Sequence, residues 1–247
     1  MWRRSLLLGL ALFSAGASRF PTTLVQQNNS SQARPKKDLI QLQQEIDARF
    51  PVTDYDAPQS TNAEEKAKRW KKNKHYDDGG MVMKNPPDEG TASTLVSHAF
   101  FALPALPTAQ SDVILTADVL KSEAHLSNDK TGVYSEFNIQ VNEVLKNTGP
   151  TLSQGNLITV SRRGGKVRYA SGHVFRYEVM SQNMPAIRGR YVFFLKAIPD
   201  TNDYEIVTGY EIGSGRVEPL DGGQFQPFRG KDVGEFINTV RDAITKN

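Results

Sequence analysis

The sequence predicts a mainly β fold, a small antiparallel β-barrel that carries a capping helix at its C-terminal end. Alternating apolar and polar residues recur in short runs from residue 113 onward, and turn-forming residues separate these runs. A single helical pattern closes the chain. A signal peptide and a largely disordered or sparsely helical segment are expected to precede the barrel.

Residues 1–17 predict a signal peptide. Two arginines lie in its cationic start, residues 6–13 form an apolar core, and residues 15–17 read Ala-Gly-Ala, a cleavage motif of small residues. An uncleaved anchor is the alternative, but the apolar run is shorter than the ~20 residues that cross a bilayer. We expect a bacterial protein that is secreted or periplasmic after cleavage before Ser18.

Residues 18–107 have the composition of a linker, with a polar tract at 26–32 and stretches rich in Pro, Asp, Ser and Asn. Two helical patterns interrupt it. Residues 36–50 place apolar side chains at helical spacing, at Leu39, Leu42, Ile46 and Phe50. Residues 63–75 are helix-prone and basic, with Trp70 as the single large apolar residue. Residues 95–106 are apolar and are expected to pack onto the following domain.

The domain at residues 108–247 begins with two strands. Val113, Leu115, Ala117 and Val119 alternate with polar residues, and residues 133–142 alternate over a longer run. The second run places Val133 to Val141 on one apolar face and residues 134, 136, 138, 140 and 142 on a wet face. Residues 127–132 (Ser-Asn-Asp-Lys-Thr-Gly) form the hairpin turn between them, and residues 147–150 end the second strand.

Further strands are expected at residues 156–162, 172–179, 190–198, 204–210 and 216–220. Residues 199–203 predict a second hairpin turn. The final helix carries one apolar stripe at Val233, Phe236, Ile237, Val240 and Ile244. Closure of six or seven such strands into a barrel removes exposed sheet edges. A β-sandwich is the second possibility, although the Cys and Trp spacing of immunoglobulin domains is absent.

The order of strands and glycines resembles a known group. The relevant segments are residues 111–114 (SDVI), 133–136 (VYSE), 141–146 (VNEVLK), 155–160 (GNLITV), 164–165 (GG) and 189–195 (GRYVFFL). They resemble exported bacterial domains of unknown function whose barrels are similar to the OB-like fold of tissue inhibitors of metalloproteinases and netrin-type modules. The resemblance implies an OB-like fold. It does not carry the inhibitors' mechanism, because that mechanism uses an N-terminal cysteine and this chain has none.

Composition excludes several kinds of chemistry. The absence of cysteine excludes disulfides, thiolate nucleophiles and Cys-ligated metals. The four histidines are not at metal-ligand spacing on one element, and no nucleophile elbow, Walker A loop or dinucleotide fingerprint is present. We therefore expect no cofactor, no metal and no catalytic residue.

One basic and aromatic cluster predicts a binding face. The net charge is +3, of which the leader arginines supply two, so the mature chain carries about +1. Between residues 161 and 190, however, seven cations stand against the single acid Glu178, with aromatic residues among them. The predicted site comprises Arg162, Arg163, Lys166, Arg168, Tyr169, Arg176 and Tyr177. A solvated charged face with core-facing aromatics is the alternative.

An OB-like barrel with such a face can bind extended polyanions. Export makes nucleic acid an unfavourable partner, so we expect an anionic glycan, a lipid headgroup or an acidic protein surface. The sequence therefore predicts an exported, non-enzymatic binding or adaptor module. The alternatives are an inhibitor or accessory partner of an extracellular enzyme, and a cell-envelope hydrolase.

Overall fold

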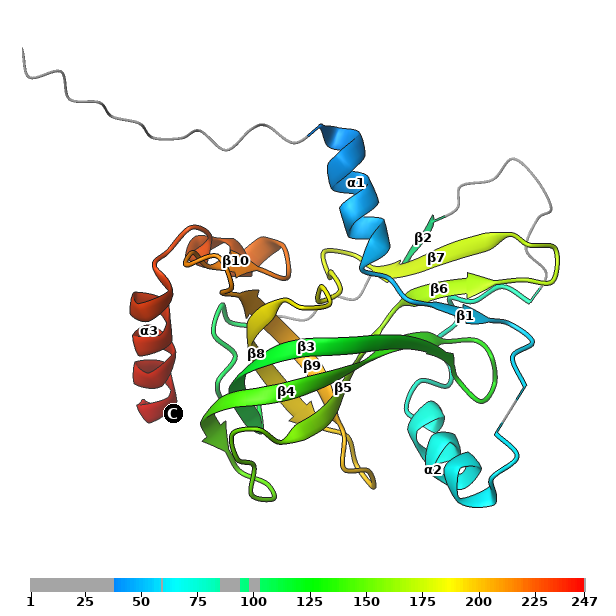
Figure 1. Ribbon diagram of the computed structural model, residues 1–247, viewed down its shortest axis with the longest axis horizontal. Coiled ribbons are helices and arrows are strands. Elements are labelled where there is room, and N and C mark those ends of the chain that lie inside the picture. Colours follow the sequence, from blue (N-terminus) through cyan, green and yellow to red (C-terminus); the bar gives the residue numbers. More distant parts are fainter. Residues whose placement is uncertain (1–37, 59, 85–93, 98–102, 247) are drawn as a thin grey trace, which may run out of the picture. The chain divides into compact units, whose positions relative to one another are not determined.

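β-Strands dominate the computed structural model, which describes residues 38–58, 60–84, 94–97 and 103–246. The predicted signal peptide and polar tract lie outside the described residues. A main sheet contains the strands β3 (Val113–Leu126), β4 (Val133–Asn147), β5 (Leu157–Arg163), β8 (Arg190–Ala197), β9 (Tyr204–Glu211) and β10 (Glu218–Pro219). Its strand order is β10-β9-β5-β4-β3-β8, and β9 also pairs with β8 (Figure 1).

Neighbouring strands in this sheet are mostly antiparallel. β3 and β4 form a long hairpin, and β8 pairs with β3 on one side and β9 on the other. The parallel contact between β5 and β9 is short, joining Val160 to Tyr204 and Ser161 to Glu205. Each of β3, β4, β5 and β8 therefore has two paired neighbours, and β9 has three, namely β5, β8 and β10. The predicted turns at residues 127–132 and 199–203 both connect hairpins as expected.

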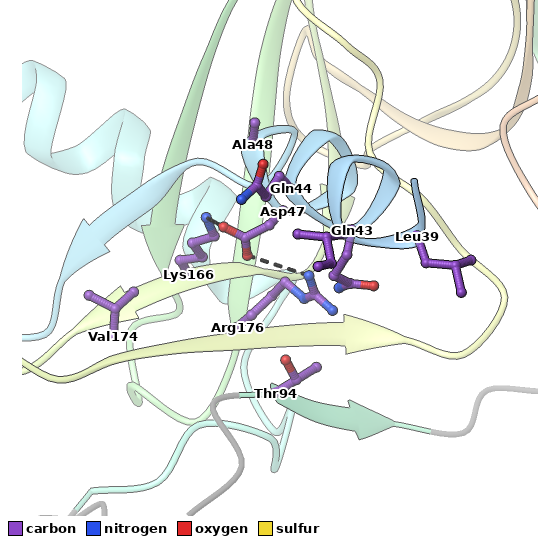
Figure 2. Close-up of a pocket in the computed structure, with 10 residues that line it drawn as sticks. Leu39, Gln43, Gln44, Asp47, Ala48, Thr94, Lys166, Val174 and Arg176 are labelled. Carbon is purple, nitrogen blue, oxygen red and sulfur yellow. Dashed lines mark hydrogen bonds and ion pairs between the residues drawn. The ribbon is translucent and has the colours of Figure 1, made fainter. Parts of the chain in front are cut away.

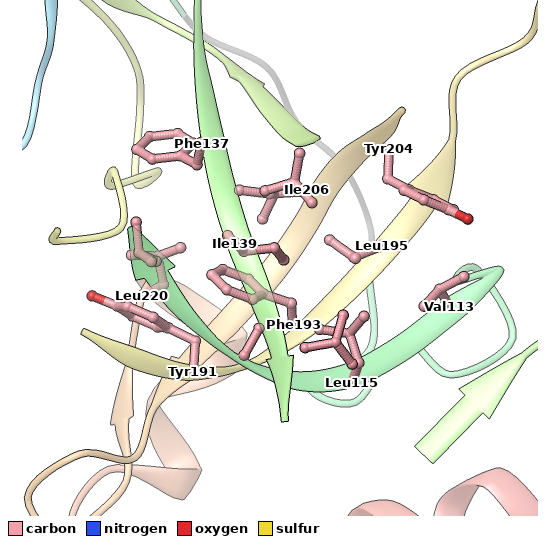
Figure 3. Close-up of a cluster of buried hydrophobic side chains, with 14 of the residues drawn as sticks. Val113, Leu115, Phe137, Ile139, Tyr191, Phe193, Leu195, Tyr204, Ile206 and Leu220 are labelled. Carbon is pink, nitrogen blue, oxygen red and sulfur yellow. The ribbon is translucent and has the colours of Figure 1, made fainter. Parts of the chain in front are cut away.

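One face of these strands encloses a core of large apolar side chains (Figure 3). Alternation along β3 and β8 sends Leu115, Phe193 and Leu195 into it, together with Ile139 from β4 and Ile206 from β9. All five are at most 3% exposed. This burial is the main stabilising contribution of the sheet, because apolar area removed from water contributes about 25 cal/mol per Å².

The opposite face of β3 and β8 is also buried, which the alternation alone did not predict. Helix α3 (Val233–Thr245) packs there, with Phe236 and Val240 against Ile114, Phe194 and Tyr210. The predicted stripe of this C-terminal helix is confirmed. Asp232 caps it by accepting hydrogen bonds from the amides of residues 234 and 235. The predicted strand at 216–220 shortens to β10, followed by a 3₁₀ helix, η1 (Gly223–Phe228).

A second sheet has the order β1-β6-β7-β2. Its members are β1 (Val52–Asp54), β6 (Gly165–Arg168), β7 (Val174–Val179) and β2 (Thr94–Ser97). The chain passes from β5 into β6 through Gly164, whose φ of 104° is a conformation that favours glycine. A side chain at this position would also place its Cβ 2.8 Å from the Tyr177 carbonyl oxygen. β6 was not predicted from the sequence.

Two strands of this second sheet come from the stretch with linker-like composition. β1 pairs in parallel with β6, and β2 pairs in parallel with β7. The same stretch contains both predicted helices, α1 (Leu39–Ala48) and α2 (Ala63–Lys74). The compact unit accordingly extends from Asp38 to Asn247. Strands of three or four residues are too short to show a clear alternation of apolar and polar residues, so the sequence did not predict them.

The predicted wet face of β4 is wrong at two positions. Asn138 and Gln140 are exposed as expected, but Tyr134 and Glu136 are 0% and 7% exposed. Both contact α2. The residue pattern of a strand does not show whether a helix from another part of the chain covers its polar face.

We expect Phe193→Ala to lower the free energy of unfolding by about 3–5 kcal/mol, because Phe193 is fully buried and truncation leaves a cavity. Leu157→Ala is the matched control, since Leu157 is 67% exposed and its change is expected to stay within about 0.5 kcal/mol. Chemical denaturation measures both. Equal losses in the two variants would contradict the described core.

Candidate functional site

Arg162 lies inside the protein and not on a surface. It is 1% exposed, and its two terminal nitrogens lie 2.8 and 2.5 Å from the carboxylate oxygens of Asp221. Arg162 also donates to the carbonyl of Asn183, and Thr208 donates to Asp221. This pair joins β5 to the segment that follows β10. A cation held this way is not available to a ligand.

The two tyrosines of the predicted site belong to a core. Tyr169 is 7% exposed and Tyr177 is fully buried, and their hydroxyl groups are 2.7 Å apart. The Tyr169 hydroxyl also lies 2.7 Å from the carbonyl oxygen of Met83, to which it donates. Their rings pack with Val133, Val167 and Phe175 between the two sheets. They offer no stacking surface to a polyanion.

Lys166 and Arg176 border a groove of about 720 Å³ between α1 and the second sheet (Figure 2). A single carboxylate, that of Asp47 on α1, lies 2.5 Å from Lys166 Nζ and 3.4 Å from Arg176. Arg176 also lies 3.1 Å from Glu178. The two cations therefore face two anions within the chain.

The last two cations of the predicted site are also engaged. Arg163 donates to the carbonyl of His75 and covers the ring of Tyr76. Arg168 is exposed and pairs with Asp54 at 3.3 Å. Six of the seven predicted residues are thus divided among a buried ion pair, an aromatic core, a groove and a surface pair, and Arg163 contacts the segment directly after α2. They do not form one exposed face, because neighbouring residues of a strand point to opposite sides.

Helix α2 presents a different cationic surface. Its sequence, AEEKAKRWKKNK, consists mostly of strong helix formers. Asn62 caps its start by accepting from the amides of Glu64 and Glu65. Acidic residues in the first turn and lysines in the last turn complement the helix dipole. The local sequence therefore accounts for the helix and for its limits.

The inner side of α2 is fixed by buried charges. Lys72 is 5% exposed, and its Nζ lies 2.8 Å from Glu136 on β4 and 2.5 Å from Asp203 before β9. Arg69, one turn earlier, lies 2.5 Å from the same Glu136 oxygen. His125 on β3 approaches the other oxygen at 3.4 Å. One carboxylate on the sheet thus anchors two cations of the helix.

Aromatic contacts complete this attachment. Tyr76, directly after α2, stacks on Tyr134 with ring centroids 4.0 Å apart. The Tyr76 hydroxyl lies 2.7 Å from Ser161 Oγ, and the Tyr134 hydroxyl donates to Asn73. Gly132 permits the close approach, because a Cβ there would lie 2.3 Å from the Tyr76 carbonyl oxygen. The rotation of α2 about its axis is therefore determined.

The anchoring carboxylate is strongly acidic. Burial alone would raise the pKa of Glu136, but the contact with His125 and the charges of Lys72 and Arg69 outweigh burial and hold its pKa well below the usual range. Glu136 is therefore ionised wherever the protein is folded at ordinary pH. Burial and the nearby Glu136 charge also raise the pKa of Tyr134, so its hydroxyl stays neutral.

The outer side of α2 carries cations that are not paired. We call it the lysine face, which consists of Lys66, Lys68, Trp70, Lys71 and Lys74. All five side chains are exposed, Trp70 at 53%. Within the described ranges no carboxylate forms an ion pair with these lysines, and Lys74 Nζ lies 5.5 Å from the centre of the Trp70 ring. This face can attract an anionic partner.

The sequence predicted the helix and its positive charge, but not which side of the helix faces the sheet. Six cations in nine residues give no sign that Arg69 and Lys72 point inward while the others point outward. The only available signal was the spacing of Arg69, Lys72, Asn73 and Tyr76, which places these residues on one side of a helix.

Comparisons with known proteins assign no family to this arrangement. No family model matches the chain, and no curated protein matches it. In the part of the chain that the structure covers, no group of His, Asp and Glu side chains could hold a metal ion. Among the described helices, none has the length and apolar character needed to cross a bilayer.

We expect acid to weaken the attachment of α2. The pKa of Glu136 is lowered by folding, so its stabilising contribution is complete above its unfolded pKa of about 4.3 and is lost as the pH falls below that value. Glu136→Gln should cost about 3–5 kcal/mol at pH 7, because it leaves Lys72 and Arg69 without full compensation. It should also flatten the fall in stability between about pH 5 and pH 2.

Denaturation curves across this pH range provide the measurement. Glu143→Gln serves as a control, because Glu143 is exposed and pairs with the exposed Arg241. An acid profile of Glu136→Gln that matches the wild-type profile would contradict the assigned role of Glu136.

Proposed function

We propose that this protein is an exported, non-enzymatic binding module and that the lysine face of α2 holds an anionic partner. One observation carries the proposal: among the described residues, four lysines of one helix are exposed without ion-pair partners, whereas Arg162, Lys166, Arg168 and Arg176 are each paired with a carboxylate of the chain. Unpaired cations on one side of a rigid helix produce a local positive field despite the nearly neutral whole.

The attachment of α2 supports this proposal. An isolated helix of 12 residues is marginal in water, but the charges around Glu136 hold α2 against the sheet. The lysines are therefore positioned before a partner arrives, which reduces the ordering cost of binding. A face used only for solubility would not require a fixed helix.

We further propose that the main sheet is an OB-like barrel of the kind found in tissue inhibitors of metalloproteinases and netrin-type modules. Pairing on both edges of β3, β4, β5, β8 and β9 supports closure, with the short β5–β9 contact as the last pairing that completes the ring. OB folds are five-stranded, partly open barrels. Export remains part of the proposal on the basis of the leader-like residues 1–17.

The test is neutralisation of the lysine face. Substitution of Lys66, Lys68, Lys71 and Lys74 by Gln should weaken binding to a heparin column and to anionic vesicles by at least about a hundredfold at low salt. Wild-type binding should fall steeply as salt rises. Elution position and co-sedimentation report the two affinities.

The matched control removes the same number of charges elsewhere. Each of its four cations is more than half exposed and is paired with a carboxylate; they are Lys121, Arg168, Arg190 and Arg229. Their combined substitution by Gln should leave binding within about threefold of wild type. If both quadruple variants lose the same affinity, net charge and not the lysine face is responsible, and the proposal fails.

A further inference from the structure

We propose that the partner of the lysine face is the surface of an anionic lipid bilayer, with Trp70 entering the headgroup region. This inference rests on the proposed function and specifies its ligand. It makes the protein a peripheral membrane-binding module in which α2 lies along the lipid surface.

The arrangement of the face carries the inference. Lys66, Trp70 and Lys74 follow one another at intervals of four residues, so they form one line along the helix. Lys68, Lys71 and Lys74 follow one another at intervals of three residues, so they form a second row that meets the first at Lys74. The single large apolar side chain is therefore flanked along the helix by the ammonium groups of Lys66 and Lys74, and these three side chains can meet one plane.

Trp70 distinguishes a bilayer from a dissolved polyanion. Its indole is half exposed, in a helix whose other outward side chains are charged or small. A sulfated glycan neutralises lysines but offers little apolar volume for an indole. A bilayer interface accepts both groups, because tryptophan favours the headgroup level and lysine stems extend along apolar surface while their charges reach phosphate.

The attachment of α2 to the sheet leaves the line of Lys66, Trp70 and Lys74 exposed. Arg69, Lys72, Asn73 and Tyr76 hold the opposite side of the helix to the sheet. Glu64 and Glu65 lie in the first turn, and the Ser60 hydroxyl lies 2.8 Å from Glu65, to which it donates. Within α2 the negative charge is therefore confined to the first turn, and the remaining turns are cationic.

The experiment uses the chain from Ser18 onward, the form expected after cleavage, because the cationic and apolar leader would itself bind anionic vesicles. The vesicles consist of phosphatidylcholine with or without about one third phosphatidylglycerol. The sequence contains two tryptophans, and Trp2 lies in the leader, so Trp70 is the single tryptophan of the chain from Ser18 onward. We expect its emission to shift to the blue with anionic vesicles and to remain unchanged with phosphatidylcholine alone. Trp70→Ala should bind anionic vesicles about tenfold more weakly while its retention on heparin stays within about twofold of wild type.

Two further arms separate the possible failures. Leu157→Ala, which removes an exposed apolar side chain elsewhere, should leave vesicle binding unchanged. If Trp70→Ala weakens binding of single-stranded oligonucleotide as much as binding of vesicles, base stacking replaces lipid insertion and the inference is overturned. It is also overturned if Trp70 shows no blue shift or if Trp70→Ala binds vesicles like wild type.

These results are independent of the broader proposal. If heparin retention depends on the four lysines but vesicle binding does not depend on Trp70, the membrane inference is rejected and the proposal of an anionic partner stands. Loss of lysine dependence on both heparin and vesicles would reject the two together.

Discussion

The buried carboxylate of Glu136 is the constraint on which the arrangement of α2 depends. It lies on β4, within the sheet that holds the main core, and attracts Arg69 and Lys72 from the same side of the helix. Removal of either partner of such a pair is costly, because it leaves a charge that water cannot reach. The same geometry that satisfies Glu136 directs the remaining lysines outward. Stability and the candidate site therefore share one cause.

The sequence was informative where elements are long and locally determined. The alternation in β4, the turn at residues 127–132 and the stripe of α3 are each visible within one segment, and the structure contains all three. It was uninformative where distant segments meet. α3 covers one face of β3 and β8, and α2 covers part of β4, so parts of these strands are buried on both sides.

The predicted binding site failed to form one face for the same reason. A count of charges between residues 161 and 190 cannot show that Asp221 lies against Arg162, or that Asp47 lies between Lys166 and Arg176. These acids come from segments far along the chain. The basic character of residues 63–75 was evident, but whether each cation faced water depended on the sheet. Local charge predicts a surface only when long-range partners are known.

Native-state hydrogen exchange of α2 tests the central claim most directly. If the charges around Glu136 fix the helix, amides in the second half of α2 should be protected far beyond an isolated 12-residue peptide and should exchange through openings comparable to those of β4. Rapid exchange of α2 at the rate of an unfolded peptide, while β4 stays protected, would contradict the account.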